Sequence, residues 1–314
     1  MQDTNNIDIN LEKPVVTTHH PTRDGLVKGS INVIKVGGAV VEDPTSLGNL
    51  LEQFANIKGN KVLVHGGGRS ATKIAASLGI ESTMVGGRRI TDGDMLNVVT
   101  MVYGGLVNKT LVALLQAQGV NAIGLTGADM NVIRSHKRPE KSVTIAAGEV
   151  NPNTGETLTE ETKVKVDFGW VGDVDKVDGQ RLATLIESGI VPIMAPLTHD
   201  GEGHILNTNA DTIASQTACG LAAVSQDDEA LYDVTLTYCF EKPGVLSNPD
   251  DDSSVISFIT EESYQQLKAD GIVSGGMIPK LDNAFEALHR GVSRVVITSA
   301  NDIEGENGTT IVLK

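Results

Sequence analysis

The fold is decided by two short glycine-rich stretches, Ile34-Lys35-Val36-Gly37-Gly38 and Val64-His65-Gly66-Gly67-Gly68. Each one closes an apolar, β-like run and precedes a helix-like segment. A strand, a glycine turn and a helix in succession point backbone N–H groups at an anion, because glycine lets the main chain approach closely and the helix N-terminus adds a favourable dipole. Two such turns, the first with a lysine, predict phosphate chemistry at the C-terminal ends of parallel strands. Neither stretch reads G-x-x-x-x-G-K-[ST] or G-x-G-x-x-G, so the phosphate is held in another way.

The same alternation continues along the chain. Apolar β-like runs occur at residues 31–36, 61–65, 120–125, 190–194, 231–237, 294–298 and 309–313. Between them, helical patterns cover residues 46–57, 69–78, about 92–118, 180–188, 211–222, 261–269 and 279–289, with Asp92 as the N-cap of the long one. Strands that alternate with helices predict an α/β fold, with a mainly parallel sheet and helices on both faces.

Two segments interrupt this rhythm and are interpreted as hairpins. Residues 137–166 are polar around Asn151-Pro152-Asn153-Thr154-Gly155, and alternating patterns at 142–146 and 162–166 flank that centre. Within residues 198–204, Asp200-Gly201 supports a second tight turn. Residues 247–254 are acidic and are predicted to form an exposed loop.

The composition limits the classes of function. The chain has 314 residues, of which 40% are apolar and 21% are charged, enough for one large α/β unit or two lobes. Aromatic residues make up only 3%, which argues against a stacking platform for single-stranded nucleic acid. The formal net charge of −15 argues against nucleic-acid and anionic-membrane partners, since both need a basic surface. Because this overall field repels anionic substrates, their site must be locally basic.

The sequence predicts a cytoplasmic protein. Cys219 and Cys239 are the only cysteines, and they stand in apolar surroundings without metal-ligand spacing, which fits a reducing compartment. Residues 1–29 are interpreted as a polar N-terminal arm that holds no apolar signal-peptide core. A run of about 18 apolar residues, which a membrane span requires, is not found.

Residues beside these glycines are candidates for the chemistry, each with a structural alternative. Lys35 ends a predicted strand, where its ammonium group either reaches a transferring phosphoryl group or extends into solvent. Residues 66–68 form either an anion cradle or a tight turn, although a turn rarely needs three glycines. His65 precedes them at a buried strand end, which favours a structural role.

Three further segments combine glycines, amides or cations with a helix start. Within Gly86-Gly87-Arg88-Arg89-Ile90-Thr91-Asp92, an arginine either takes a carboxylate bidentately or forms a surface salt bridge. In Asn207-Thr208-Asn209-Ala210-Asp211, the amide and acid side chains either cap the helix or orient a substrate or a lysine. Gly275-Gly276-Met277-Ile278-Pro279-Lys280 places a second lysine in a first helical turn, where it either serves the site or is solvated.

Taken together and in this order, the segments resemble the amino acid kinase family over about residues 31–314. The resemblance rests on IKVGG at 34–38, HGGG at 65–68, GRRITD at 87–92, ILNTNAD at 205–211 and GIVSGGMIPK at 271–280. Any one of these motifs is modest evidence for the family, whereas five of them in the same order are highly specific evidence. The resemblance implies a three-layer α/β/α sandwich around a mainly parallel sheet. It also implies that residues 30–222 bind an N-acyl amino acid and provide a dimer contact, and that residues 223–314 bind ATP.

The resemblance implies a role for each site residue. Lys35 and Lys280 match the two lysines that stabilise the transferring phosphoryl group. Asp211 matches the acid that positions both lysines and, through water, the Mg²⁺ that accompanies ATP. Arg89 matches the residue that grips the substrate α-carboxylate. The other implied substrate contacts are Gly67, Gly68, Asn207 and Asn209, and the implied nucleotide contacts are Gly37, Gly38, Gly66, Glu241, Gly244, Ile272, Val273, Ser274 and Gly276.

The chain departs from the family pattern in three places. Phe240-Glu241-Lys242-Pro243-Gly244-Val245-Leu246 stands where relatives commonly read Thr-Asp-Val-Pro-Gly-Val-Leu, so Glu241 takes the place of an aspartate near the adenosine. The excursion at 137–166 is longer than usual. The arm carries Pro14 and Pro21 and lacks the amphipathic helix that joins dimers into arginine-inhibited hexamers in part of the family. A homodimer is therefore expected.

The implied reaction is transfer of the ATP γ-phosphoryl group to the side-chain carboxylate of N-acetyl-L-glutamate, which yields an acyl phosphate in a step of arginine biosynthesis. Such a carboxylate has a pKa of about 4.3 and is already ionised at neutral pH, so it needs no general base. The same chemistry on N-succinylglutamate or N-acetyl-2-aminoadipate is an alternative, as is a non-catalytic amino acid sensor of the same fold. Retention of Lys35, Asp211 and Lys280 together argues against the sensor.

Overall fold

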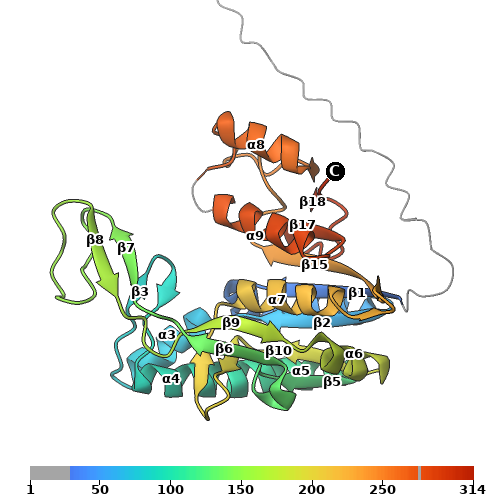
Figure 1. Ribbon diagram of the computed structural model, residues 1–314, viewed down its shortest axis with the longest axis horizontal. Helices are drawn as coiled ribbons and strands as arrows, with labels where there is room; N and C mark the ends of the chain where they lie inside the picture. The colour runs from blue at the N-terminus through green and yellow to red at the C-terminus, as the bar shows by residue number, and fades with distance from the viewer. Residues whose placement is uncertain (1–28, 275–276) are drawn as a thin grey trace, which may run out of the picture.

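The computed structural model describes residues 29–274 and 277–314, and its centre is an eight-stranded sheet (Figure 1). The strands lie in the order β16-β18-β17-β15-β1-β2-β10-β5. β17 and β18 pair antiparallel, and the other neighbours in this sheet pair parallel, which confirms the predicted mainly parallel sheet. The bounds are β1 (Gly29–Val36), β2 (Asn60–His65), β5 (Ala122–Leu125), β10 (Val191–Met194), β15 (Tyr232–Phe240), β16 (Phe258–Ile259), β17 (Arg294–Ser299) and β18 (Thr309–Ile311).

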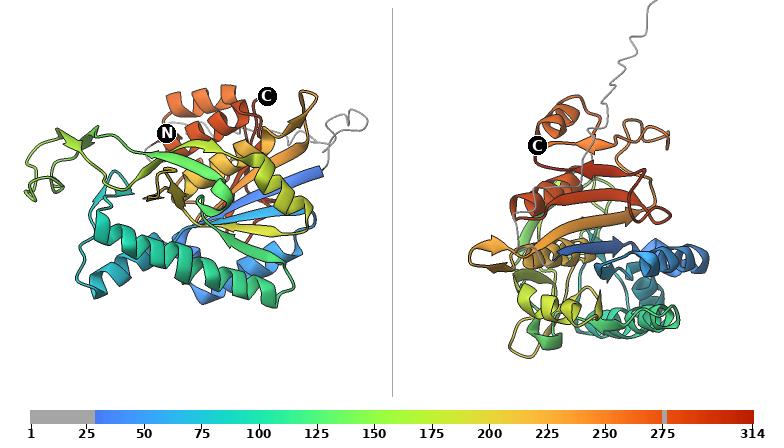
Figure 2. Two further views of the ribbon diagram at one scale, coloured as in Figure 1. Left: turned by 60° about the horizontal axis from the view of Figure 1, so that its bottom comes forward. Right: turned by 90° about the vertical axis from the view of Figure 1, so that its right-hand side faces the viewer.

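Helices cover both faces of this sheet, so the three-layer α/β/α sandwich is also confirmed (Figure 2). Successive residues of β1 face opposite sides, because Val33 belongs to one apolar cluster and Ile34 to the other. Near-continuous apolar strands of this kind are typical of parallel sheets buried on both faces. The cluster around Val33 includes residues of α6 (Gly179–Glu187), α7 (Ala210–Ala222) and α9 (Met277–His289). The cluster around Ile34 includes residues of α2 (Pro44–Asn56), α3 (Gly68–Ser77), α4 (Gly93–Val99) and α5 (Asn108–Ala117).

The predicted helices are all present, and their ends fall within two residues of the predicted ends. Asp92 caps α4 as expected, since its side chain accepts a hydrogen bond from the backbone N–H of Met95. The sequence did not indicate α1 (Gly38–Glu42), which is a single short turn after the first glycine pair. The remaining predicted helix is α8 (Glu261–Ala269).

The long helix over Gly93–Ala117 contains an unexpected π-helical segment, η1 (Thr100–Val107), between α4 and α5. By length and composition this stretch would be long and apolar enough to cross a membrane, contrary to the expectation from the sequence. Its buried side chains, among them Met95, Val102 and Leu111, belong to the core cluster around Ile34. One side of this long helix therefore contributes to the core of the protein.

A second sheet, of four strands in the order β12-β11-β6-β9, packs against α7 through β9. The antiparallel β11–β12 hairpin confirms the turn predicted at 198–204. β6 and β9 were not predicted, because polar side chains occupy many of their positions. The bounds are β6 (Ile133–Lys137), β9 (Gly172–Val177), β11 (Leu197–His199) and β12 (Ile205–Asn207).

Two hairpins project together from one end of the molecule (Figures 1 and 2). β7 (Lys141–Ile145) and β8 (Thr162–Val166) pair antiparallel, which confirms the hairpin predicted within 137–166. β3 (Met84–Val85) and β4 (Arg88–Arg89) form the smaller one. A small apolar cluster joins the two hairpins and consists of Val85, Ile145, Val164, Val166, Phe168 and Val171. The excursion thus supports the hairpin that carries both arginines of the GRRITD motif.

Candidate active site

The two glycine turns lie against each other at the C-terminal ends of β1 and β2. These strands pair parallel with Val36 opposite His65, and the Gly66 N–H donates to the Val36 carbonyl at 3.1 Å. A Cβ on Gly66 would lie 3.0 Å from the Gly38 nitrogen, and one on Gly67 would lie 3.0 Å from Cδ1 of Tyr103. Close packing, as well as the tight turn, therefore favours glycine at both positions.

The second turn leads directly into α3, whose N-cap is Gly67. Among the residues that the structure describes, no side chain caps this helix, so the N–H groups of its first turn are available to an anion. The two turns together form a concave backbone surface, which we call the glycine cradle, made of Gly37, Gly38, Gly66, Gly67 and Gly68.

Lys35, Asp211 and Lys280 come together next to the glycine cradle. The Lys35 Nζ lies 2.7 Å from Oδ1 of Asp211, and the Lys35 side chain is only 8% exposed. Burial lowers the pKa of Lys280 below its ordinary value, the neighbouring Lys35 lowers it further, and Asp211 opposes the shift. This cluster of two cations and one anion thus comes from three elements that are far apart in the sequence, namely β1, α7 and α9.

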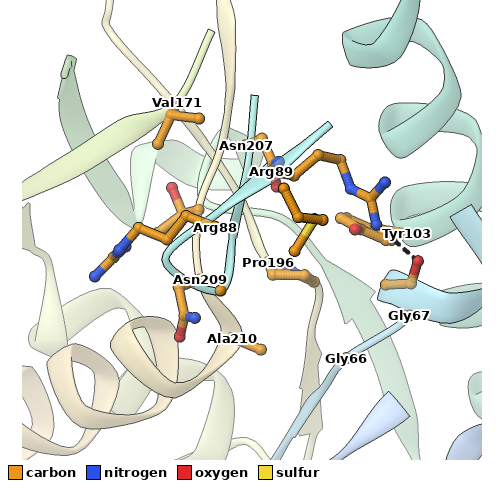
Figure 3. A pocket seen from close by; sticks show the side chains of 14 residues that line it. Gly66, Gly67, Arg88, Arg89, Tyr103, Val171, Pro196, Asn207, Asn209 and Ala210 are labelled. Carbon is orange, nitrogen blue, oxygen red and sulfur yellow. Dashed lines mark hydrogen bonds between the residues drawn. The ribbon is translucent and has the colours of Figure 1, made fainter. Parts of the chain in front are cut away.

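A cavity of about 190 Å³ opens beside the glycine cradle (Figure 3). Arg88 and Arg89 follow each other on β4 and point to opposite sides of this cavity. Tyr103 of η1 lies next to Gly67 and Arg89, and burial raises the pKa of its hydroxyl. The remaining lining residues include Met84, Val171, Pro196, Asn207, Thr208, Asn209 and Ala210.

Arg89 is buried in the cavity wall, with 7% of its surface exposed. Its Nη2 donates to the Gly68 carbonyl and to Oγ1 of Thr72, both at 2.9 Å, and its Nη1 donates to Oγ of Ser82. Its Nε has no partner in the part of the chain that the structure describes. Burying a charged donor without a partner is costly, and the Tyr103 hydroxyl also hydrogen-bonds to this guanidinium.

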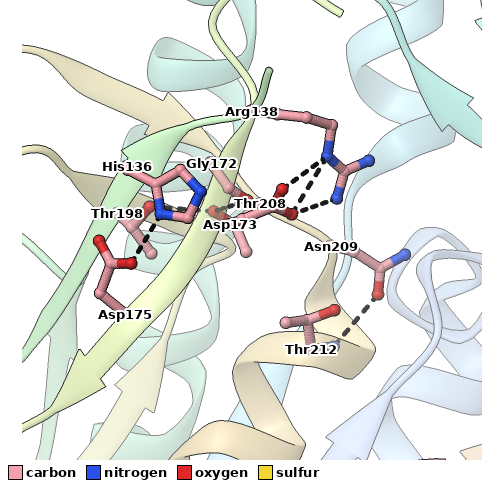
Figure 4. A network of polar contacts seen from close by, with 9 residues as sticks. All are labelled: His136, Arg138, Gly172, Asp173, Asp175, Thr198, Thr208, Asn209 and Thr212. Carbon is pink, nitrogen blue, oxygen red and sulfur yellow. Dashed lines mark hydrogen bonds and ion pairs between the residues drawn. The ribbon is translucent and has the colours of Figure 1, made fainter. Parts of the chain in front are cut away.

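The other arginine, Arg88, is half-buried and forms no ion pair among residues 29–274 and 277–314. Burial lowers the pKa of its guanidinium, the nearby Arg138 adds to this shift, and Asp173 and Asp211 oppose it. Arg138 itself is 5% exposed and is paired with Asp173 (Figure 4). Of these two neighbouring arginines, Arg138 therefore has a carboxylate partner and Arg88 does not.

The asparagines of the ILNTNAD segment have structural partners as well as positions in the cavity wall. Asn207 is buried, and its Nδ2 donates to Oγ1 of Thr91 at 2.9 Å. Asn209 is the N-cap of α7, since its Oδ1 accepts from the backbone N–H groups of Asp211 and Thr212 (Figure 4). Of the two interpretations of Asn209, the cap is the one that the hydrogen bonds support.

Of the implied nucleotide contacts, Gly66 lines this cavity, whereas the contacts that the structure describes after residue 240 do not. Glu241 is exposed and pairs with Arg69 at 3.3 Å. Gly244 is buried where a Cβ would meet Oγ1 of Thr309 at 2.7 Å, so packing alone requires a glycine there. Val273 is buried, Ile272 is half-buried and Ser274 is exposed. Gly276 lies outside the described residues.

His65 has the structural role that the sequence favoured. It is fully buried, its Nδ1 lies 2.8 Å from the Gly66 carbonyl, and its Nε2 lies 3.1 Å from Nδ2 of Asn108. These partners assign the proton to Nδ1 and the acceptor role to Nε2. Burial lowers the pKa of His65 to about 4, so the ring is neutral at pH 7.

Sequence reasoning missed two residues of the site, Tyr103 and Phe240. Tyr103 stands in an apolar helical run, where an aromatic residue is normally a core residue. Phe240 ends β15, and its ring lies beside both lysines. The only sequence signal was the departure of residues 240–246 from the family pattern, and our sequence analysis drew a consequence from it for Glu241 alone.

Comparison with known proteins agrees with this geometry. Residues 30–299 match the model of the amino acid kinase family. An acetylglutamate kinase from Bacteroides thetaiotaomicron is 59% identical over 285 residues, which cover 91% of this chain and 99% of that protein. An acetylglutamate kinase from Methanopyrus kandleri is 36% identical over 281 residues, which cover 90% of this chain and 100% of that protein.

Solved structures share the fold. The smu.665 protein of Streptococcus mutans is 26% identical with a TM-score of 0.66, and the match covers 90% of this chain and 99% of that one. Carbamate kinase from Giardia lamblia is 16% identical with a TM-score of 0.56, and the match covers 91% of this chain and 99% of that one. The chain belongs to the amino acid kinase family.

Proposed function

We propose that this protein transfers the γ-phosphoryl group of ATP to the side-chain carboxylate of N-acetyl-L-glutamate, a step of arginine biosynthesis. The observation that carries the proposal is the cluster of Lys35, Asp211 and Lys280 beside the glycine cradle and the Arg89 cavity. The relatives named acetylglutamate kinase, matched along nearly their whole length, support the choice of substrate.

The cluster has the chemistry that phosphoryl transfer requires. A carboxylate oxygen attacks the γ-phosphorus, the bond to the ADP oxygen breaks, and an acyl phosphate and ADP result. The carboxylate nucleophile is ionised at neutral pH, which agrees with a site whose one buried histidine, His65, is a neutral structural group. The barrier is instead the meeting of two anions, and the ammonium groups of Lys35 and Lys280 offset the charge that spreads over the phosphoryl oxygens.

The donor set also fits the phosphates of a nucleotide and its metal. The glycine cradle presents uncapped backbone N–H groups, and a Cβ at Gly66 or Gly67 would lie only 3.0 Å from a neighbouring atom. Mg²⁺ bound to ATP would supply further positive charge, and Asp211 would reach it through water. Asp211 also holds the Lys35 ammonium in place at 2.7 Å.

In this proposal, two consecutive parts of the chain each bind one of the substrates. Residues 30–222 bind the acylated amino acid, with Arg89 on its α-carboxylate and Gly67, Gly68, Asn207 and Asn209 around it. Residues 223–314 bind ATP. The phosphates meet Gly37, Gly38 and Gly66, and the nucleoside lies near Glu241, Gly244, residues 272–274 and Gly276.

We also propose that the enzyme is a cytoplasmic homodimer. The long helix over Gly93–Ala117 exposes the apolar side chains of Met101 and Leu106 to 55% and 57%, and that of Leu114 to 40%. Large apolar side chains gathered on one exposed helix are typical of an interface with a second copy.

A hydroxamate assay for acyl phosphate tests the function. Purified protein is given ATP and, in parallel, glutamate, N-acetylglutamate, N-succinylglutamate or N-acetyl-2-aminoadipate. The proposal predicts the highest kcat/KM with N-acetylglutamate. A higher value with N-succinylglutamate would overturn the substrate assignment and would point to Arg88, the cation opposite Arg89, as the partner of the extra carboxylate. No acyl phosphate with any acceptor would support the non-catalytic sensor.

A further inference from the structure

Phe240, the last residue of β15, lies beside both lysines of the site. The Lys280 Nζ is 3.7 Å from the centroid of the Phe240 ring, and the Lys35 Nζ is 5.1 Å from it. Both distances are within the range over which the negative face of an aromatic ring attracts an ammonium group. The half-buried ring is roughly parallel to that of Tyr238, with the centroids 6.0 Å apart, which helps to hold its plane.

The two lysines differ in their other partners. Lys35 is held by Asp211, whereas Lys280 makes no ion pair in the described portion of the chain. Lys280 is also half-buried, and the charged groups that act on it are Lys35 of β1 and Asp211 of α7. The aromatic ring is therefore the close partner that holds the Lys280 ammonium beside a second cation.

An aromatic ring suits this position better than a carboxylate. A carboxylate beside Lys280 would neutralise the ammonium, and an incoming phosphate would have to break that ion pair. The ring attracts the ammonium without neutralising it, and it leaves the N–H donors of the lysine for a phosphate oxygen.

We propose that Phe240 is a positioning residue for phosphoryl transfer, whose ring holds Lys280 next to Lys35 with both charges available to the transferring group. This inference rests on the proposed function and adds to it a positioning residue beside the two lysines.

Three variants test the proposal by steady-state kinetics with ATP and N-acetylglutamate. Phe240→Leu removes the ring face and keeps an apolar side chain, and Phe240→Tyr keeps the face. Phe258→Leu is the matched control, because Phe258 is also half-buried and lies on β16 of the same sheet. We expect kcat of Phe240→Leu to fall by about 2- to 30-fold, which is the fold-change equivalent to one cation–π contact, with KM for N-acetylglutamate unchanged. Phe240→Tyr and Phe258→Leu should retain kcat.

The pH profile of kcat separates positioning from a structural role. The ring stabilises the charged form of Lys280, so its loss should lower the pKa of that lysine and move the alkaline limb of kcat to lower pH. A misfolded fraction would lower kcat at every pH and leave the limb in place. Unchanged kcat and an unchanged limb in Phe240→Leu would overturn the proposal. A lower kcat in Phe240→Leu would also overturn it if the alkaline limb did not move and Phe240→Tyr had the same low kcat.

A measurement without substrates keeps this inference distinct from the proposed function. Lysines carrying ¹³C-methyl groups are titrated by NMR in the wild-type protein and in Phe240→Leu, and Lys280→Arg identifies the Lys280 signal. We expect that signal to titrate at lower pH when the ring is absent, and superimposable titration curves would contradict the inference. If the wild-type protein phosphorylates none of the acceptors, the proposed function fails, and this titration still decides the role of Phe240.

Discussion

Lys35 and Asp211 are 176 positions apart in the sequence, yet the Lys35 Nζ lies 2.7 Å from Oδ1 of Asp211. Lys35 is the last residue but one of the central strand β1, and Asp211 lies in the first turn of α7, which packs on that strand. The glycine cradle begins at Gly37, directly after the end of this strand. The pair therefore fixes the position of one ammonium group relative to the backbone that would hold phosphate.

Asp211→Asn should lower kcat by about 100-fold with little change in the KM for N-acetylglutamate. The amide cannot hold the Lys35 ammonium as the carboxylate does, and a displacement of about 1 Å in a catalytic group costs a factor of this size. Asp233→Asn, an exposed aspartate on β15, is the control and should keep wild-type kcat. A wild-type kcat in Asp211→Asn would show that the pair is not part of the catalytic machinery.

Arg89→Ala should raise the KM for N-acetylglutamate and leave ATP affinity unchanged. A hydrogen bond between charged groups contributes about 1.5–3 kcal/mol, which corresponds to a rise of about 10- to 150-fold. Arg290→Ala is the control, because it removes an exposed arginine whose partners, Glu286 and Gln216, lie outside the proposed site. An equal loss of ATP affinity, measured by calorimetry, would mean that Arg89 serves the nucleotide instead.

The buried His65 should make the protein less stable in acid. Its pKa is lowered to about 4 in the folded state, whereas the unfolded chain binds the proton near pH 6.5. This contribution to the free energy of unfolding is therefore fully present above pH 6.5 and is lost as the pH falls toward 4, by about 3 kcal/mol. Urea unfolding of wild type and His65→Gln across this range measures it. Equal pH slopes for the two proteins would contradict the assignment.

The protein should be a homodimer of the 33.1 kDa chain, with the Gly93–Ala117 helix at the contact. Leu106→Asp should shift the mass measured by light scattering to that of one chain. Leu78→Asp is the control, because Leu78 is equally exposed but lies on another surface, directly after α3. Millimolar arginine should change neither mass nor activity. A mass near six chains, or strong inhibition by arginine, would show that the arm before Gly29 has been misinterpreted.

The sequence predicted the central sheet well because its strands are buried on both faces. Residues such as Ile31, Val33 and Val62 belong to near-continuous apolar runs, which are typical of strands buried on both faces. β6 carries Arg134, His136 and Lys137 at exposed positions, so its pattern is that of a loop. The π-helical segment η1 was not predictable, since its apolar residues continue the helical pattern on both sides.

The sequence predicted the site residues that are charged and stand beside glycines or a helix start. It did not predict the aromatic residues, whose place in the site depends on how the chain packs. The lysines and Asp211 stand beside glycines or a helix start, which marked them as candidates. Nothing in the local pattern around Tyr103 or Phe240 separates a cavity-lining aromatic residue from a core one. For Asn209, the sequence permitted both a cap and a substrate contact, and the hydrogen bonds to Asp211 and Thr212 show the cap.

The most direct test of the central claim is kcat for acyl phosphate formation by Lys280→Ala with saturating ATP and N-acetylglutamate. Lys280 acts on charge that develops during transfer, so the account predicts a fall of about 10²–10³-fold in kcat with KM for N-acetylglutamate nearly unchanged. A variant that turns over at close to the wild-type rate would contradict it.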